Sequence, residues 1–210
     1  MTERLHGTEL EESAREPRPG VAFFREGGAV LLDRDGVISQ DAFVNRVEDL
    51  VLLPGAAAAI ARLNRGRIPV AVVTNQGGIA MGHLAEDTLS AIHETMARLL
   101  AEEGSHVDAV YYCPHMANAR LTAYRLDCPC RKPGIGMLEK ARDELDIDLS
   151  RSVLVGDSTT DILAGIRGGC RTILVETGFG GKDAKVDATP DAVVADLSAA
   201  VDLMLESTGN

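Results

Sequence analysis

Four short polar segments of the chain carry the residue types that phosphoryl transfer requires. A carboxylate can attack phosphorus, a second carboxylate can move protons, and cationic and hydroxyl groups can neutralise the transferred oxygens. The segments are Asp33-Arg34-Asp35-Gly36, Thr74-Asn75-Gln76, Arg131-Lys132-Pro133 and Gly156-Asp157-Ser158-Thr159-Thr160-Asp161. Together they predict Mg²⁺-dependent phosphoryl transfer through an aspartyl nucleophile.

In the first segment, Asp33 is expected to be the nucleophile and Asp35 the general acid and base. Residues i and i+2 of an extended segment share a side, so both carboxylates can face one phosphoryl group. Gly36 lets the chain turn away sharply. An Asp-x-Asp-Gly string is also typical of a turn or of a calcium loop, although the Glu of a calcium loop is missing at the required spacing.

A divalent cation is expected because the two carboxylates would otherwise repel a phosphate dianion. Asp33, the backbone carbonyl of Asp35, and Asp157 form an oxygen ligand set suited to Mg²⁺. Asp161 has two open interpretations: it supports the metal site through water, or it caps the helix that follows it.

Thr74 and Lys132 are expected to neutralise the phosphoryl oxygens, and Asn75 and Gln76 to extend this polar net. Each of these residues is common in loops or on surfaces. Their order between the aspartate segments points to a site. No Gly-x-x-x-x-Gly-Lys-Ser/Thr loop is present to indicate a nucleotide-binding fold instead.

A second cluster precedes Lys132 and consists of Cys113, His115, Cys128 and Cys130. Three thiolates and one imidazole can form a closed tetrahedral Zn²⁺ site, which would hold the loop that carries Arg131 and Lys132. The alternatives are buried free cysteines or a disulfide. Cys170 is expected in the core, and the other histidines are assigned to surface or core: His6, His83, His93 and His106.

Apolar runs at residues 29–32, 70–73 and 152–155 precede three of the polar segments and predict buried strands of a parallel sheet. The carboxyl ends of such strands meet at one rim, where ligands bind. Further strands are predicted at 172–175 and 192–194, and helices at 56–63, 85–103, 137–145 and 161–166, with a final helix after residue 194.

The composition favours a single α/β domain, since the chain has 210 residues of which 45% are hydrophobic and 25% charged. We expect residues 27–210 to fold and residues 1–26 to form a poorly ordered extension. The net charge of −11 disfavours nucleic-acid binding. No long apolar stretch or signal-peptide core occurs, which predicts a cytoplasmic location without membrane contact. We further expect a monomer.

The motifs Asp-Arg-Asp-Gly-Val, Thr-Asn-Gln, Cys-Arg-Lys-Pro and Gly-Asp-Ser-Thr-Thr-Asp-Ile resemble the haloacid dehalogenase superfamily. The Cys-x-His loop ending in Cys-x-Cys-Arg-Lys-Pro looks like that of the D-glycero-D-manno-heptose 1,7-bisphosphate 7-phosphatases and the related histidinol-phosphate phosphatases. This resemblance, over residues 28–180, implies a Rossmann-like three-layer domain with a central parallel sheet, a zinc-stabilised loop and no large cap.

The resemblance implies a phosphoric monoester hydrolase that acts on a small phosphorylated sugar, with Mg²⁺ and Zn²⁺ as cofactors. It places Asp41 in a substrate wall and gives Arg131 the substrate's distal phosphate. Histidinol phosphate is the alternative substrate, and a catalytically inactive, zinc-stabilised interaction protein is the alternative of another class. Met81 stands where heptose phosphatases often carry Arg.

Overall fold

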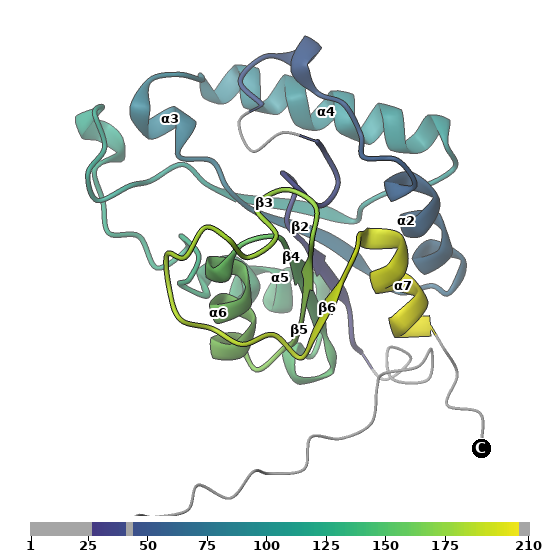
Figure 1. Cartoon of the computed structure of the whole chain (residues 1–210). Coiled ribbons are helices and arrows are strands. Elements are labelled where there is room, and N and C mark those ends of the chain that lie inside the picture. The colour runs from purple at the N-terminus through teal and green to yellow at the C-terminus, as the bar shows by residue number, and fades with distance from the viewer. Residues whose placement is uncertain (1–26, 41–43, 206–210) are drawn as a thin grey trace, which may run out of the picture.

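A six-stranded, entirely parallel sheet runs through the centre of the computed structural model (Figure 1), which describes residues 27–40 and 44–205. The strand order is β3-β2-β1-β4-β5-β6. The strands are β1 (Val30–Leu32), β2 (Val70–Asn75), β3 (Ala109–Cys113), β4 (Val153–Gly156), β5 (Arg171–Val175) and β6 (Ala192–Val194). The predicted extension over residues 1–26 and the predicted substrate residue Asp41 lie outside the described residues.

Helices connect the strands and cover both faces of the sheet, giving three layers (Figure 1). The helices are α2 (Ala56–Arg65), α3 (Gly78–Met81), α4 (Glu86–Glu102), α5 (Gly136–Leu145), α6 (Thr159–Gly168) and α7 (Leu197–Leu205), with 3-10 turns at Val47–Asp49, Thr122–Tyr124 and Leu149–Arg151. Apolar residues of α2, α4 and α7 form one core with the sheet, and those of α5 lie in a second core on the other face.

The strands alternate between these two cores, as the period of two in a β-strand requires. Val30 and Leu32 of β1 belong to the core under α2, α4 and α7, whereas Leu31 belongs to the core under α5. Both faces of β1 are therefore buried, which explains why its sequence is an unbroken apolar run.

The register of the sheet brings the polar segments together. Leu32 at the end of β1 pairs with Val72 of β2 and with Val155 of β4. Asp33 follows one residue after this level, and Thr74 and Asp157 follow two residues after it. All three side chains therefore lie at the carboxyl rim of adjacent strands, as predicted.

The predicted three-layer α/β fold is confirmed, and the expected helices occur within a few residues of their predicted ends. The sequence analysis missed β3, an edge strand in which only Tyr111 and Cys113 are buried. It also ended β2 too early, because Thr74 and Asn75 still pair with β3. In the described ranges, no helix is long and apolar enough to cross a membrane.

Candidate active site

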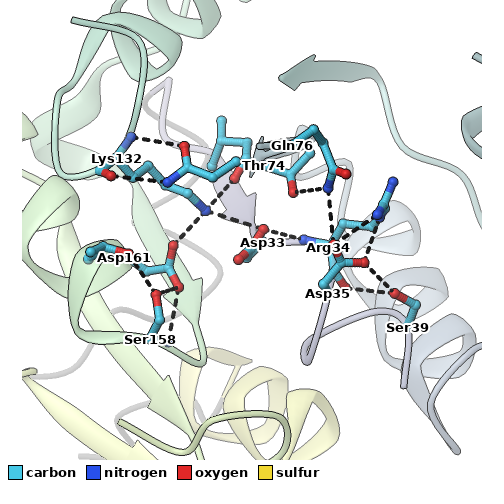
Figure 2. Close-up of polar contacts among 12 residues, drawn as sticks. Asp33, Arg34, Asp35, Ser39, Thr74, Gln76, Lys132, Ser158 and Asp161 are labelled. Atoms are coloured by element: carbon cyan, nitrogen blue, oxygen red, sulfur yellow. Dashed lines mark hydrogen bonds and ion pairs between the residues drawn. The ribbon is translucent and has the colours of Figure 1, made fainter. Parts of the chain in front are cut away.

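The buried ammonium group of Lys132 lies between two carboxylates at the sheet rim (Figure 2). Its Nζ atom is 2.5 Å from Oδ1 of Asp161 and 3.2 Å from Oδ1 of Asp33, and it donates to the carbonyl of Val73 at 2.7 Å. Burial alone would lower the pKa of Lys132, but the two carboxylates outweigh this effect and raise it. Lys132 is therefore a fixed positive charge beside Asp33.

The backbone of Lys132 is attached to β2 by a reciprocal pair of hydrogen bonds. The Asn75 side chain donates from Nδ2 to the Lys132 carbonyl and accepts the Lys132 N–H at Oδ1, each at 3.0 Å. Both polar atoms of the Asn75 side chain are used in this way. This clamp places the loop before α5 against the end of β2, which brings Lys132 to the rim.

Asp33 is held by the sheet and by its own neighbour. Its N–H donates to the Val155 carbonyl at 2.9 Å, and its Oδ1 accepts the Arg34 N–H at 2.7 Å. Burial raises the pKa of Asp33 to about 6, Lys132 opposes that rise, and Asp161 adds to it.

Asp157 directly follows β4 and lies at the same rim of the sheet as Asp33. Its Oδ2 accepts the N–H of Phe179 at 2.7 Å, from the loop after β5. Gly36 and Gly178 lie so close that a Cβ at either position would be within 2.3 Å of this oxygen. Burial, followed by the charge of Asp33, raises the pKa of Asp157 to about 7.

One oxygen each from Asp33, Asp157 and Asp161 lie within 4.8 Å of one another. The raised pKa values of Asp33 and Asp157 reflect the cost of crowding these carboxylates in a buried place. A divalent cation would relieve this repulsion, and a set of oxygen donors is what Mg²⁺ prefers. The residues present therefore fit the metal that the sequence predicted.

Asp161, at the third position of α6, takes part in the N-terminal capping of that helix, which confirms one of its two interpretations. Its Oδ2 accepts from Ser158 N–H at 3.0 Å and from Ser158 Oγ at 2.7 Å, completing a capping box at the start of α6. The other carboxylate oxygen pairs with Lys132. A single fully buried carboxylate thus ties the start of α6 to the lysine of another segment.

Asp35 is engaged by residues from both sides (Figure 2). Gln76 donates from Nε2 to Oδ2 of Asp35 at 3.0 Å and to the Thr74 hydroxyl at 3.0 Å. Arg34 and Ser39 bind the same carboxylate. Sequence reasoning did not single out Arg34, although its place between the two aspartates was a signal.

A cavity of about 400 Å³ opens above these groups. All of the predicted catalytic and substrate residues within the described ranges line it, together with the predicted metal ligand Asp157: Asp33, Asp35, Thr74, Asn75, Gln76, Arg131, Lys132 and Asp157. Val44, which adjoins the predicted substrate wall around Asp41, lines it too. Residues that the sequence analysis did not connect with the site also line it, among them Asn45, His83, Met116, Phe179 and Lys185. They come from separate loops with no motif of their own, so only the fold could bring them together.

The cysteine and histidine cluster lies beyond β3. One donor atom each from Cys113, His115 and Cys128 lie within 4.8 Å of one another, and Cys113 Sγ is 3.9 Å from His115 Nδ1. Cys130 is outside this group of three, although its thiol neighbours that of Cys128. Burial raises the pKa of Cys113 to about 11. All four cysteines of the chain are free, so the disulfide alternative is wrong.

Comparison with known proteins matches the HAD-hydrolase-like family model to residues 129–200. The chain is 41% identical over 183 residues to D-glycero-D-manno-heptose-1,7-bisphosphate 7-phosphatase of Thermosynechococcus vestitus, covering 83% of this chain and 93% of that protein. It is 40% identical over 181 residues to D-glycero-beta-D-manno-heptose-1,7-bisphosphate 7-phosphatase of Bordetella bronchiseptica, covering 84% of this chain and 97% of that protein.

Solved structures give the same relationship. The B. bronchiseptica D,D-heptose 1,7-bisphosphate phosphatase, complexed with magnesium and phosphate, is similar with a TM-score of 0.74 and 40% identity, over 83% of this chain and 96% of that one. A putative HAD-like phosphatase from Mesorhizobium loti is similar with a TM-score of 0.73 and 33% identity, over 94% of this chain and 93% of that one.

The double role of Asp161 predicts a large loss of stability in Asp161→Ala. The variant leaves the buried Lys132 ammonium with the Asp33 carboxylate at 3.2 Å and removes the acceptor of the Ser158 N–H. We therefore expect the free energy of unfolding, measured in urea titrations, to fall by about 3 kcal/mol, the lower end of the range for breaking a buried ion pair. Asp196→Ala is the control, because Asp196 accepts the Ala199 N–H at the start of α7. Loss of this cap alone should cost about 1 kcal/mol. Equal losses in the two variants would contradict the structural importance of the Lys132 pair.

Proposed function

The chain belongs to the haloacid dehalogenase-like hydrolases, among the D-glycero-D-manno-heptose 1,7-bisphosphate 7-phosphatases, and we propose that it removes the 7-phosphate of a heptose 1,7-bisphosphate through an aspartyl-phosphate intermediate. The observation that carries the proposal is the pairing of buried Lys132 with Asp33 in a cavity that Asp35 and Asp157 also line. The identity to heptose bisphosphate phosphatases, which extends over most of the chain, supports the substrate class.

We assign the chemical steps to two aspartates. An oxygen of Asp33 attacks the phosphorus, and the bond from phosphorus to the sugar oxygen breaks while Asp35 gives that oxygen a proton. Water then attacks the phosphorus and loses a proton to Asp35. The bond from phosphorus to Asp33 breaks, which releases inorganic phosphate and returns both carboxylates to their starting states.

The surrounding polar groups stabilise the transferred phosphoryl oxygens. Lys132 supplies a fixed positive charge and Thr74 supplies a hydroxyl donor. Such electrostatic stabilisation of the phosphoryl oxygens is the main contribution of a protein to phosphoryl transfer. Asn75 acts on the phosphoryl group through Lys132, whose backbone it holds. Gln76 orients Asp35 and Thr74.

Asp33, the carbonyl of Asp35, and Asp157 would hold Mg²⁺, with Asp161 behind them. When bound, the metal neutralises charge on the carboxylates and on the phosphate oxygens. The crowding of three carboxylate oxygens within 4.8 Å supports this assignment.

We also assign a structural zinc to Cys113, His115, Cys128 and Cys130. Sulfur and nitrogen ligands of a tetrahedral zinc ion lie about 3.6 Å apart, given a Zn–S bond of about 2.3 Å and a Zn–N bond of about 2.0–2.1 Å. The 3.9 Å between Cys113 Sγ and His115 Nδ1 is close to this length. The His115 carbonyl accepts from Nη1 of Arg131 at 3.2 Å, so the same loop orients the guanidinium.

The distal phosphate of the substrate would meet cations at the cavity wall. Arg131 and Lys185 both line the cavity, and Asp41 remains a predicted substrate residue. Met81 also lines it, so an uncharged side chain stands on this wall where the resemblance to heptose phosphatases implies an arginine. Lys185 lies 5.0 Å from the centre of the Phe179 ring and 3.7 Å from Oδ2 of Asp183, which directs its ammonium group along the loop after β5.

The first test is phosphate release with Mg²⁺ from both anomers of heptose 1,7-bisphosphate and from histidinol phosphate. We expect one bisphosphate anomer to be preferred and Asp33→Asn to reduce its turnover by at least about 1,000-fold, because the nucleophile is lost. Turnover of histidinol phosphate alone would replace the substrate assignment. No turnover of any substrate would favour the inactive interaction protein.

The zinc assignment predicts about one zinc ion per chain in the purified protein, measured by elemental analysis. Cys130→Ser should lower the zinc content and the melting temperature, because the closed site loses a ligand. Cys170→Ser is the control, since Cys170 lies in the core under α5. A zinc-free native protein whose loop cysteines react freely with a thiol reagent would contradict the site.

Lys185→Met should raise the KM for the bisphosphate about tenfold, because loss of a charge-assisted hydrogen bond costs about 1.5 kcal/mol at a half-exposed site. We expect kcat, and the KM for heptose 7-phosphate, to stay unchanged. Lys182→Met is the matched control on the same loop, because Lys182 does not line the cavity. An equal change in KM for the bisphosphate and for heptose 7-phosphate in Lys185→Met would contradict the assignment of Lys185 to the distal phosphate.

A further inference from the structure

Arg34 is a fully buried arginine that lies between the two aspartates in the sequence. A guanidinium cannot lose its charge inside a protein, so burying it requires acceptors for its N–H groups. Arg34 follows Leu32 by two residues, so the two side chains point to the same side of the extended segment. The Leu32 side chain packs in the core under α4. Arg34 therefore points away from the side of the strand that carries Asp33, toward that helix.

The Arg34 guanidinium binds the Asp35 carboxylate through two hydrogen-bond donors. Nε donates to Oδ1 at 2.8 Å and Nη2 donates to Oδ2 at 2.8 Å, which is the parallel geometry that only an arginine can provide (Figure 2). Ser39 adds a second donor to Oδ1 at 3.1 Å, and Gln76 adds a second donor to Oδ2. Each oxygen of the Asp35 carboxylate therefore accepts two hydrogen bonds, one of which comes from Arg34.

The remaining nitrogen of the Arg34 guanidinium, Nη1, contacts His93 of α4 and lies 3.2 Å from the His93 Nε2 atom. Burial, followed by the charge of Arg34, lowers the pKa of His93 to about 4, so the imidazole is neutral near pH 7. Because the guanidinium has only donors, Nε2 must be the acceptor and Nδ1 carries the ring proton.

We infer that Arg34, supported from behind by His93, is a positioning residue that fixes the Asp35 carboxylate for proton transfer. The inference rests on the proposed function, in which Asp35 protonates the leaving sugar oxygen. Neither Arg34 nor His93 lines the cavity, so both act through Asp35 and not on the substrate. Loss of the His93 acceptor would leave a buried donor unpaired and loosen the grip on Asp35.

The test compares kcat/KM for two leaving groups, because kcat/KM covers the steps through leaving-group release. A sugar alkoxide needs a proton to leave, whereas p-nitrophenolate leaves as a stable anion. We expect His93→Leu to lower kcat/KM about tenfold for the heptose bisphosphate and less than about twofold for p-nitrophenyl phosphate. His93→Gln, which keeps an acceptor, should stay within about twofold of wild type on both substrates.

Two further variants sharpen the comparison. Arg34→Lys, which keeps the charge but cannot bind both oxygens, should lower kcat/KM for the sugar substrate at least as much as His93→Leu. His106→Leu is the control, because His106 is exposed. Equal losses on both leaving groups, as partial unfolding would give, or no loss in His93→Leu would overturn the inference.

The activity of the wild-type protein distinguishes a failure of this inference from a failure of the proposed function. A wild type that hydrolyses p-nitrophenyl phosphate but not the heptose bisphosphate would contradict the substrate assignment. The ratios for the His93 variants are then measured with another primary alkyl phosphate, and they decide the positioning role by the same criterion.

Discussion

The buried ion pair network around Lys132 is the interaction on which the site depends. Its ammonium group lies within 3.2 Å of carboxylate oxygens from two segments, Asp33 after β1 and Asp161 at the start of α6. An unpaired charge at this depth would cost several kcal/mol, so the three segments can be buried only together. Because the same lysine belongs to the loop that carries the cysteines, the order of that loop and the order of the phosphate site are coupled.

Charge balance explains the rest of the arrangement. The chain carries a net charge of −11, yet its proposed substrate is an anion. Favourable local charge must therefore come from few groups held in fixed places, and a fully buried Lys132 meets that need. The carboxylates of Asp33, Asp157 and Asp161 exceed what one lysine can neutralise. A bound divalent cation would balance this excess charge, so the electrostatics of the rim favour the metal independently of its proposed role in the reaction.

Much of this could be predicted from the sequence, because apolar runs followed at once by polar motifs identify strand ends, and parallel strand ends share a rim. The strand and the cavity residues that were not predicted were missed for physical reasons. The edge strand β3 is only partly buried, and its sequence Ala-Val-Tyr-Tyr-Cys has two tyrosines in place of the aliphatic run that marks β1 and β4. Phe179 and Lys185 reach the cavity through a loop whose course depends on the packing of Gly36 and Gly178 against Asp157, and no local motif encodes that contact.

Arg34 escaped notice for a different reason: arginine is usually exposed, and its neighbours in the chain already had roles. Its burial is tolerated because one partner is adjacent in sequence and the other, His93, is 59 residues away on α4. A sequence gives the first partner directly and the second only once the fold is known. Pairing an arginine with a neutral imidazole also avoids a second buried charge, which would compete with Arg34 for the Asp35 carboxylate. The helix that covers this face of the sheet therefore contributes to the chemistry at the rim without touching the substrate cavity.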